Sequence, residues 1–417
     1  MQFNLILTVL FMTILFITVL YPVALKIGLT DRPCHRKQHK EPTPLIGGLA
    51  SYLAILVTMS INYGYFPHQL AYILASTLLV CVGLVDDYKE LGVKIRIITQ
   101  IVAVMIMTEI ADLKITDLGD LVGFGNIHLG IFATAFTLFA VVGGINAFNM
   151  IDGIDGLAGG LTLISITAIA AIAWMFQDIQ LFNFCCIFIA AIIGFLLFNL
   201  RIFGRPSAKI FLGDTGSTLF GFTVCWLAIY SSQGEHKLIS PVQVLWLIGV
   251  PLIDSVCIMC RRLSKGRSPF AADREHLHHI LSLAGYSINQ VLIGLLMSSL
   301  ILCMIGITAG LSLNYRDEVL FAFFLILFVG YYWCMCHAWT IMKIARFLHT
   351  KQGGNERSND RRKTERRINT IITVERRAFE NRRVITERRY IPSQEQLTAV
   401  YKLEQRMKNI HILKIGR

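Results

Sequence analysis

Residues 180–199 read QLFNFCCIFIAAIIGFLLFN, a stretch without a single charged side chain. A helix needs about twenty apolar residues to cross roughly 30 Å of hydrocarbon. Similar stretches recur from the first residues to about residue 343. The chain is 54% hydrophobic and 16% charged, whereas a soluble domain is about 45–50% apolar and about 25% charged. The sequence therefore predicts an all-α protein that crosses a membrane many times.

The apolar stretches predict eleven transmembrane helices, each separated from the next by a polar connection. They cover residues 3–25, 45–63, 70–86, 95–111, 129–147, 158–176, 180–199, 209–231, 242–261, 289–312 and 318–342. Lipid supplies the apolar surroundings and helices satisfy their own backbone, so no single water-excluded core is required.

The basic residues predict the orientation of these helices. One set of connections, together with the C-terminal tail, carries 36 of the 39 Lys and Arg residues, and the opposite set carries Lys114, Lys237 and Arg316. Lys and Arg are concentrated on the cytoplasmic side of membrane proteins. The N-terminus is therefore expected outside and the C-terminus in the cytoplasm. The net charge of +12 follows from this topology, so no nucleic acid partner is expected.

The chain divides into a membrane domain, residues 1–343, and a basic cytoplasmic tail, residues 344–417. The tail has few apolar residues and repeats paired arginines such as Arg376-Arg377 and Arg388-Arg389. Such a composition cannot build a core, which favours a disordered or partly helical segment. Two readings stay open for it: a merely solvated tail, and attachment to anionic lipid headgroups or to a partner of unknown identity.

Acidic and histidine residues of the membrane domain gather at predicted helix ends on the cytoplasmic side. They are Asp86, Asp87, Asp152, Asp155, Asp214, Asp273, His276, His278 and His279. Adjacent carboxylates repel one another, and a divalent cation removes that penalty. Oxygen ligands without thiolates suit a hard ion such as Mg²⁺, which binds through one or two carboxylates and otherwise through phosphates and water.

Basic residues and glycines on the same side complete the elements of a phosphoryl-transfer site. Lys94, Arg96, Lys209 and Arg267 could hold a diphosphate, while glycines such as Gly153 and Gly213 let backbone N–H groups approach an anion. Catalysis at such sites comes mostly from positioning and charge neutralisation. The histidines could instead hold zinc, and Asp254 inside the ninth predicted helix could be functional or a helix-to-helix hydrogen bond.

Five separated motifs resemble those of the polyprenyl-phosphate N-acetylhexosamine-1-phosphate transferase family, within residues 1–343. They are Asp31 to His39 with Pro44 to Gly48; Asp86-Asp87; Asn146 to Gly160; Lys209 to Ser217; and Arg261 to His279. The chain looks most like the WecA branch, the undecaprenyl-phosphate N-acetylglucosamine-1-phosphate transferases of bacteria. Leu277 interrupts the histidine run, which in the murein-precursor branch is continuous. The resemblance implies a bundle of eleven helices with a cytoplasmic active-site cleft, in the bacterial inner membrane.

The family reaction implies roles for individual residues. Undecaprenyl phosphate attacks the β-phosphate of a UDP-sugar, and UMP leaves. The resemblance places Asn149 and Asp214 on Mg²⁺, with Mn²⁺ able to substitute. It assigns catalytic roles to Asp86, Asp87, Asp152, Asp155, His276, His278 and His279, with Asp86 or Asp87 serving as a base or as a further metal-site acid. Substrate contacts are expected from Lys37, His39, Lys94, Arg96, Asn146, Phe211 and Arg267, with Phe211 stacking on uracil.

Several alternatives remain at this point. The donor expected is UDP-N-acetylglucosamine, for the first step of O-antigen or related polysaccharide synthesis, but no side chain reads the epimer of the sugar. Another UDP-N-acetylhexosamine and the murein-precursor reaction are the enzymatic rivals. The rival of another class is a transporter of lipid or nucleotide sugar, which would place polar groups near the bilayer midplane. A homodimer is left open.

Overall fold

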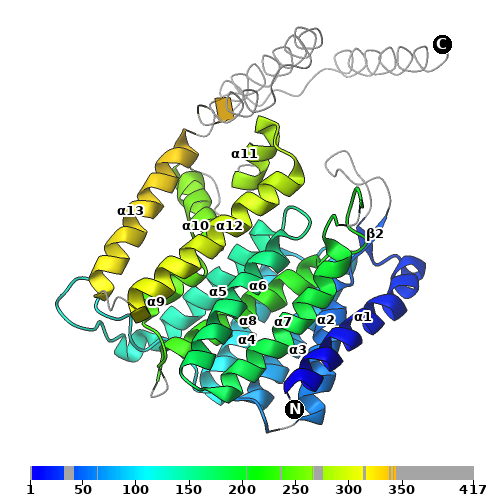
Figure 1. The fold of residues 1–417 in the computed structure, drawn as a ribbon, viewed down its shortest axis with the longest axis horizontal. Helices are drawn as coiled ribbons and strands as arrows, with labels where there is room; N and C mark the ends of the chain where they lie inside the picture. Colours follow the sequence, from blue (N-terminus) through cyan, green and yellow to red (C-terminus); the bar gives the residue numbers. More distant parts are fainter. Residues whose placement is uncertain are drawn as a thin grey trace. The chain divides into compact units, whose positions relative to one another are not determined.

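The computed structural model describes residues 2–31, 42–62, 64–202, 204–234, 237–264, 266, 276–312, 316–337, 340 and 342–343. The predicted substrate contacts Lys37, His39 and Arg267, and the tail from residue 344 onward, lie outside these residues. Within them the regular secondary structure is helical except for one short antiparallel strand pair (Figure 1).

The helices follow the predicted order along the chain. They are α1 (Gln2–Ile27), α2 (Gly47–Ile61), α3 (Gln69–Lys89), α4 (Val93–Ile110), α5 (Ala133–Ile151), α6 (Leu157–Met175), α7 (Ile179–Asn199), α8 (Gly213–Ser232), α9 (Pro241–Leu247), α10 (Gly249–Ser264), α11 (Leu277–Ala284), α12 (Ile288–Ile307) and α13 (Asp317–Cys336). A 3₁₀ turn, η1 (Gly130–Phe132), precedes α5, and a π-helical turn, η2 (Thr308–Ser312), follows α12. Strands β1 (Thr30–Asp31) and β2 (Thr43–Pro44) pair with each other.

Seven helices of the described chain are long and apolar enough to cross a membrane, or eight if α9 and α10 together form one bent span. A multi-pass α-helical membrane protein is thus confirmed. Three other helices overlap predicted spans but differ in character: α2 is short, α4 carries Lys94, Arg96 and Glu109, and α8 is rich in Gly, Ser and Thr. The number eleven therefore stays a prediction.

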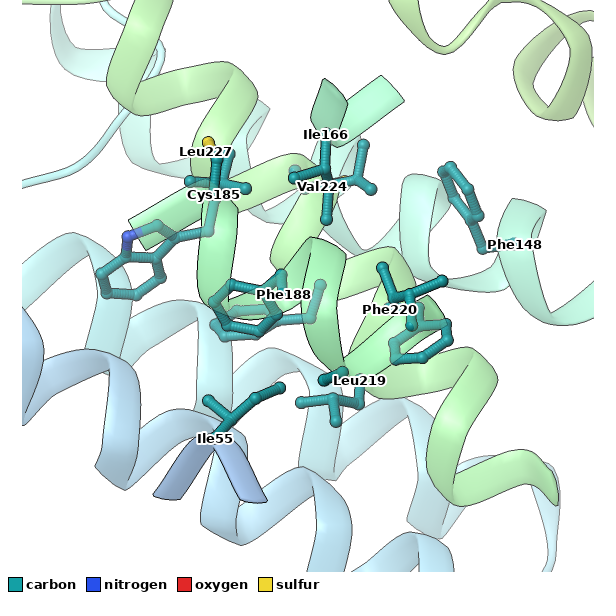
Figure 2. Close-up of a cluster of buried hydrophobic side chains, with 14 of the residues drawn as sticks. Ile55, Phe148, Ile166, Cys185, Phe188, Leu219, Phe220, Val224 and Leu227 are labelled. Carbon is teal, nitrogen blue, oxygen red and sulfur yellow. The ribbon is translucent and has the colours of Figure 1, made fainter. Parts of the chain in front are cut away.

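The moderate hydropathy of α8 follows from its place at the centre of the bundle. It packs against α2, α3, α5 and α6, and nearly all of its side chains are buried. Figure 2 shows Leu219, Phe220 and Val224 of α8 among buried side chains from the surrounding helices. A helix that faces protein instead of lipid needs close packing more than an apolar surface. By contrast, α1 and α13 lie at opposite edges of the bundle (Figure 1) and are mostly exposed.

Two glycines let α2 and α3 approach the start of α8. A Cβ atom at Gly48 would lie 2.3 Å from the Cα of Gly216, and one at Gly83 would lie 2.7 Å from the Cα of Thr215. Backbones that approach this closely leave no room for a side chain, which is how membrane helices gain van der Waals contact. The crossing brings the C-terminal end of α3 against the N-terminal end of α8.

The ninth predicted helix, residues 242–261, is not continuous, which corrects the sequence prediction. Between α9 and α10 the chain bends by 86°. Pro251 has no N–H to donate to the carbonyl of Leu247, so the helical hydrogen bond is lost at that point. The hydroxyl of Ser165 on α6 (2.8 Å) and the thiol of Cys303 on α12 (3.4 Å) donate to this carbonyl instead. Donors from neighbouring helices thus replace the hydrogen bond that the break removes from the carbonyl of Leu247.

Candidate active site

Asp87, in the last turn of α3, binds the first turn of α8. Its carboxylate accepts hydrogen bonds from the backbone N–H groups of Asp214 (2.7 Å) and Thr215 (3.2 Å) and from the hydroxyl of Thr215 (2.6 Å). The first N–H groups of a helix have no partner within it, and a negative charge there is favourable. Asp87 therefore caps α8 from another helix and fixes the position of Asp214.

Gly213 makes this capping contact possible. Its φ angle is +75°, a backbone conformation that side chains rarely adopt. A Cβ atom at this position would also lie 2.5 Å from Oδ2 of Asp87. A larger residue would therefore push Asp87 away from the N-terminus of α8.

Arg96, from the first turn of α4, lies between two carboxylates. Its Nε is 3.2 Å from Oδ2 of Asp86, and its Nη1 is 3.3 Å from Oδ2 of Asp214. The backbone N–H of Leu91 donates to the other oxygen of Asp86 at 2.6 Å. Asp86 is buried, whereas Asp214 keeps 40% of its side chain exposed. A single cation thus offsets the repulsion between two acids brought from α3 and α8.

Asn149, in the last turn of α5, adds a fourth helix to the site. Its amide group donates to Oδ1 of Asp214 at 2.8 Å and to the hydroxyl of Ser217 at 2.9 Å. The two residues that the family resemblance places on Mg²⁺ are therefore in direct contact, 65 positions apart in sequence.

The side chains present fit a hard divalent cation that relies on its substrate. Asp214 and Asn149 supply a partly exposed carboxylate and an amide, without a thiolate nearby. Within the described residues, no group of three or more His, Cys, Asp or Glu side chains is arranged to hold a metal by itself. Mg²⁺ does not need one, because it takes one or two carboxylates and completes its shell with phosphate oxygens and water.

Asp152 and Asp155, in the connection between α5 and α6, have different surroundings. Asp152 is exposed to solvent. Asp155 instead accepts hydrogen bonds from Nε of Arg201 (2.7 Å) and from the backbone N–H of Ala208 (3.1 Å). We assign Asp155 to holding the segment between α7 and α8 in place.

Phe211 precedes α8 and ties its start to the N-terminal part of the chain. Its backbone N–H donates to the carbonyl of Pro44 (2.9 Å), and its carbonyl accepts from Gly47 (3.0 Å). The side chain is partly buried. The family motifs at residues 44–48 and 209–217 are thus adjacent in space.

The histidine motif forms the start of α11, a short helix outside the predicted transmembrane helices. His276 precedes the first residue of the helix, and the rings of His278 and His279 lie 4.2 Å apart. His278 is buried, and a Cβ atom at Gly153 would lie 2.1 Å from its Nε2, so its ring packs against the connection between α5 and α6. Burial, with His279 and His276 nearby, lowers the pKa of His278 to about 3. The ring is therefore neutral at physiological pH.

Two other predicted substrate contacts, Asn146 and Lys94, form no side-chain hydrogen bond or ion pair with Asp86, Asp87, Asn149 or Asp214 among the residues that the structure describes, and they have other surroundings. Asn146 on α5 donates to Gln100 on α4 (2.8 Å) and to the carbonyl of Val142 (2.7 Å), while Lys94 is exposed in the first turn of α4. Sequence reasoning did not single out Gln100 or Arg201. Their importance comes from partners 46 positions away, which leave no local sequence pattern.

The chain is similar in sequence to known glycosyl transferases. Residues 69–232 match a family model described as glycosyl transferase family 4. The chain is 42% identical over 326 residues to the undecaprenyl-phosphate alpha-N-acetylglucosaminyl 1-phosphate transferase of Salmonella typhi, covering 78% of this chain and 88% of that protein. The proteins of the same name from Escherichia coli strain K12 and Haemophilus influenzae are 41% and 36% identical over 78% of this chain, covering 88% and 91% of their own lengths.

Proposed function

The chain belongs to glycosyl transferase family 4, and on that premise we propose that it transfers N-acetylglucosamine 1-phosphate from UDP-N-acetylglucosamine to undecaprenyl phosphate. UMP is released, and undecaprenyl-diphospho-N-acetylglucosamine starts O-antigen or a related surface polysaccharide. The observation that carries the proposal is the convergence of Asp86, Asp87, Asn149 and Asp214, from three helices, at one end of the bundle.

The reaction is a phosphoryl transfer in which an oxygen of the lipid phosphate bonds to the β-phosphorus of the UDP-sugar. The bond from that phosphorus to the oxygen bridging toward the α-phosphate breaks, and UMP leaves with the electron pair. A bound Mg²⁺, held by Asp214 and Asn149 and replaceable by Mn²⁺, would neutralise charge on the diphosphate. Positioning and charge neutralisation supply most of the catalysis in such reactions.

The protein side chains would mainly orient the reactants. A lipid phosphate monoester has a second pKa near 6 and is mostly dianionic at pH 7. Asp86 would therefore act less as a base than as the acid that keeps Arg96 beside Asp214. Asp152 is exposed and would be accessible to substrate, and neutral His278 would provide hydrogen bonds without adding charge.

We also propose that the protein has eleven spans in the bacterial inner membrane, with its N-terminus outside and the active site in a cytoplasmic cleft. The asymmetry of Lys and Arg between the two sets of connections supports this orientation. The bent pair α9 and α10, together with α2, α4 and α8, would complete the count beyond the seven apolar helices.

Purified protein with undecaprenyl phosphate, Mg²⁺ and a panel of UDP-sugars tests the proposal through UMP release. UDP-N-acetylglucosamine is expected to give the highest kcat/KM in the panel, which includes UDP-N-acetylgalactosamine and the murein precursor. Preference for another UDP-N-acetylhexosamine would correct the sugar but keep the reaction. Absence of UMP release with every donor would refute the transferase proposal.

A further inference from the structure

A buried acid, Asp254 on α10, lies outside the group formed by Asp86, Asp87, Asn149 and Asp214. Its Oδ2 is 2.7 Å from Nδ1 of His276, and its Oδ1 accepts from the hydroxyl of Tyr331 on α13 (2.5 Å) and from the backbone N–H of Leu277 (3.4 Å). Asp254 is 3% exposed and His276 is 5% exposed. One carboxylate thus joins α10 and α13 to the start of α11.

The surroundings of Asp254 determine which nitrogen of His276 carries hydrogen. A carboxylate accepts hydrogen bonds but cannot donate them, so Nδ1 of His276 must be the donor. A carboxylate that fixes the orientation and tautomer of a histidine in this way is a recurring arrangement at functional sites. If Asp254 served only to join α10 to α13, the contact with Tyr331 would suffice. Instead, both of its oxygens bind the residues that begin α11.

A chain of ring contacts leads from His276 to the connection between α5 and α6. The rings of His276 and His278 are nearly parallel, with an interplanar angle of 16° and centroids 5.6 Å apart. His278 in turn packs against Gly153, which directly follows Asp152. A shift of His276 would therefore be transmitted to the side chains that face the proposed substrate site.

We propose that Asp254 and Tyr331 are positioning residues for the histidine segment, His276–His279. They hold His276 in the tautomer with hydrogen on Nδ1 and keep α11 oriented so that His278 packs on the connection between α5 and α6. Neither residue touches substrate. The inference rests on the proposed function, because it assigns the two residues to the transferase reaction through the histidines.

Asp254→Asn gives a specific test because its shape is nearly unchanged. An asparagine has one accepting oxygen and one donating amide group. If the oxygen stays with Tyr331 and Leu277, the amide faces Nδ1 of His276, which must then accept. The hydrogen of His276 should therefore move to Nε2.

The full-length protein, labelled with ¹⁵N-histidine and held in lipid nanodiscs, reports this change by nuclear magnetic resonance, and loss of the signal in His276→Asn assigns it. Wild-type protein is expected to show hydrogen on Nδ1 and Asp254→Asn to show it on Nε2. With undecaprenyl phosphate and UDP-N-acetylglucosamine, the variant should lose about tenfold in kcat while KM changes less than about twofold. A general loss of structure would also lower the apparent kcat at unchanged KM, but it would not move the hydrogen of His276 to Nε2, so the tautomer signal is the specific readout.

Tyr331→Phe and Tyr72→Phe form a matched pair of controls. Each removes one hydroxyl from a side-chain hydrogen bond. The bond of Tyr331 to Asp254 is partly buried, and that of Tyr72 to the hydroxyl of Thr223 (2.6 Å) is fully buried. We expect Tyr331→Phe to lower kcat about threefold and Tyr72→Phe to leave it unchanged at comparable loss of thermal stability. If Asp254→Asn does not fold, this pair of variants still tests the positioning role.

The outcomes separate this inference from the proposed function. An unchanged His276 signal in Asp254→Asn, or equal kcat values in Tyr331→Phe and Tyr72→Phe, overturns the positioning role. A wild-type protein that releases no UMP refutes the transferase proposal. The tautomer measurement would even then show whether Asp254 fixes His276.

Discussion

Acidic residues at the two ends of the bundle are satisfied in different ways. At the end with α9 and the N-terminus of α13, Asp117 and Asp120 accept from the backbone of Gly119 (2.8 Å) and Gly123 (2.6 Å), and Asp112 pairs with Lys114 (2.7 Å). Such contacts over two or three positions hold a loop in shape, and Asp117 also pairs with Lys237 of another connection (3.6 Å). The acids at the other end form a carboxylate cluster, defined here as Asp86, Asp87, Asp152 and Asp214.

The contacts of the carboxylate cluster join distant parts of the chain. Asp87 binds residues 127 and 128 positions away, and Asp214 is reached by Arg96 from 118 positions away. Several helices must fold together to bring these acids within reach of one another. Like charges gathered at such cost in electrostatic repulsion indicate a site for cations and phosphates, whereas acids that each have their own backbone or cation partner indicate structure alone.

Of the changes considered, metal removal is expected to have the largest effect on catalysis. Excess EDTA should abolish UMP release, and Mg²⁺ or Mn²⁺ should restore it, because the carboxylate cluster lacks enough cations of its own. The midpoint of thermal unfolding should change little, since helix packing does not depend on the ion. Full activity in excess EDTA would exclude a metal at Asp214.

Substitution of Asp214 is the next test. Asp214→Asn keeps the shape of the side chain but removes its charge, and we expect about a hundredfold loss of kcat, on the order of 2.7 kcal/mol of transition-state stabilisation. Asp120→Asn, at the opposite end, should retain wild-type turnover. Similar activity in the two variants would show that the ends do not differ in the way proposed.

Substitution in the histidine motif should lower catalysis less than substitution of Asp214. His278→Ala removes the ring that packs on Gly153, and we expect about a tenfold loss of kcat/KM, on the order of 1.4 kcal/mol. His128→Ala, an exposed histidine at the opposite end, is the control. Elemental analysis checks the zinc alternative at the same time: one zinc per chain would contradict a role of these histidines in phosphate or sugar contacts.

The pKa of His278 predicts a pH dependence of stability. Its pKa is about 3 in the folded protein and about 6.5 in an unfolded chain. The unfolded state therefore binds more protons as the pH falls below about 6.5, and the fold loses stability, by about 1.4 kcal/mol at pH 5.5. Thermal unfolding of wild-type protein and His278→Gln in detergent at pH 7.5 and 5.5 measures this loss of stability. An equal decrease of the unfolding temperature in both proteins would contradict the assignment to His278.

The tail is expected to affect catalysis least. The carboxylate cluster and the histidine segment are complete by His279, so a chain truncated after Thr350 should insert and transfer sugar phosphate in detergent. The isolated tail should bind vesicles containing anionic lipid and release them as salt rises, because its arginines are screened over about 8 Å at physiological ionic strength. An inserted but inactive truncated enzyme would place the tail in the catalytic machinery. Failure to bind anionic vesicles at low salt would favour another partner or a solvated tail.

The sequence predicted the helical membrane fold and the grouping of acids because both depend on local patterns. Apolar stretches mark helices such as α7, and carboxylates at their ends mark one side of the membrane. The family motifs placed Asn149 beside Asp214, which the structure shows in contact.

Features that depend on contacts between distant residues were not predictable in this way. The break after Leu247 needs Ser165 and Cys303 to satisfy its carbonyl, and no window of sequence contains all three. Asp155 resembles Asp152 in sequence, and only the structure shows that Asp155 contacts Arg201, 46 positions away. The same applies to Asp254, whose partner Tyr331 lies 77 positions away.

The bend between α9 and α10 has a consequence for how the chain is made in the cell. At about 1.5 Å per residue, α9 spans only about 10 Å and α10 about 24 Å, so neither alone crosses roughly 30 Å of hydrocarbon. Ser165 is synthesised before the bend, whereas Cys303 emerges from the ribosome 56 residues after Leu247. The bent pair can therefore contact α6 early but is fully enclosed only after α12 has been synthesised. Its insertion is completed late in biosynthesis.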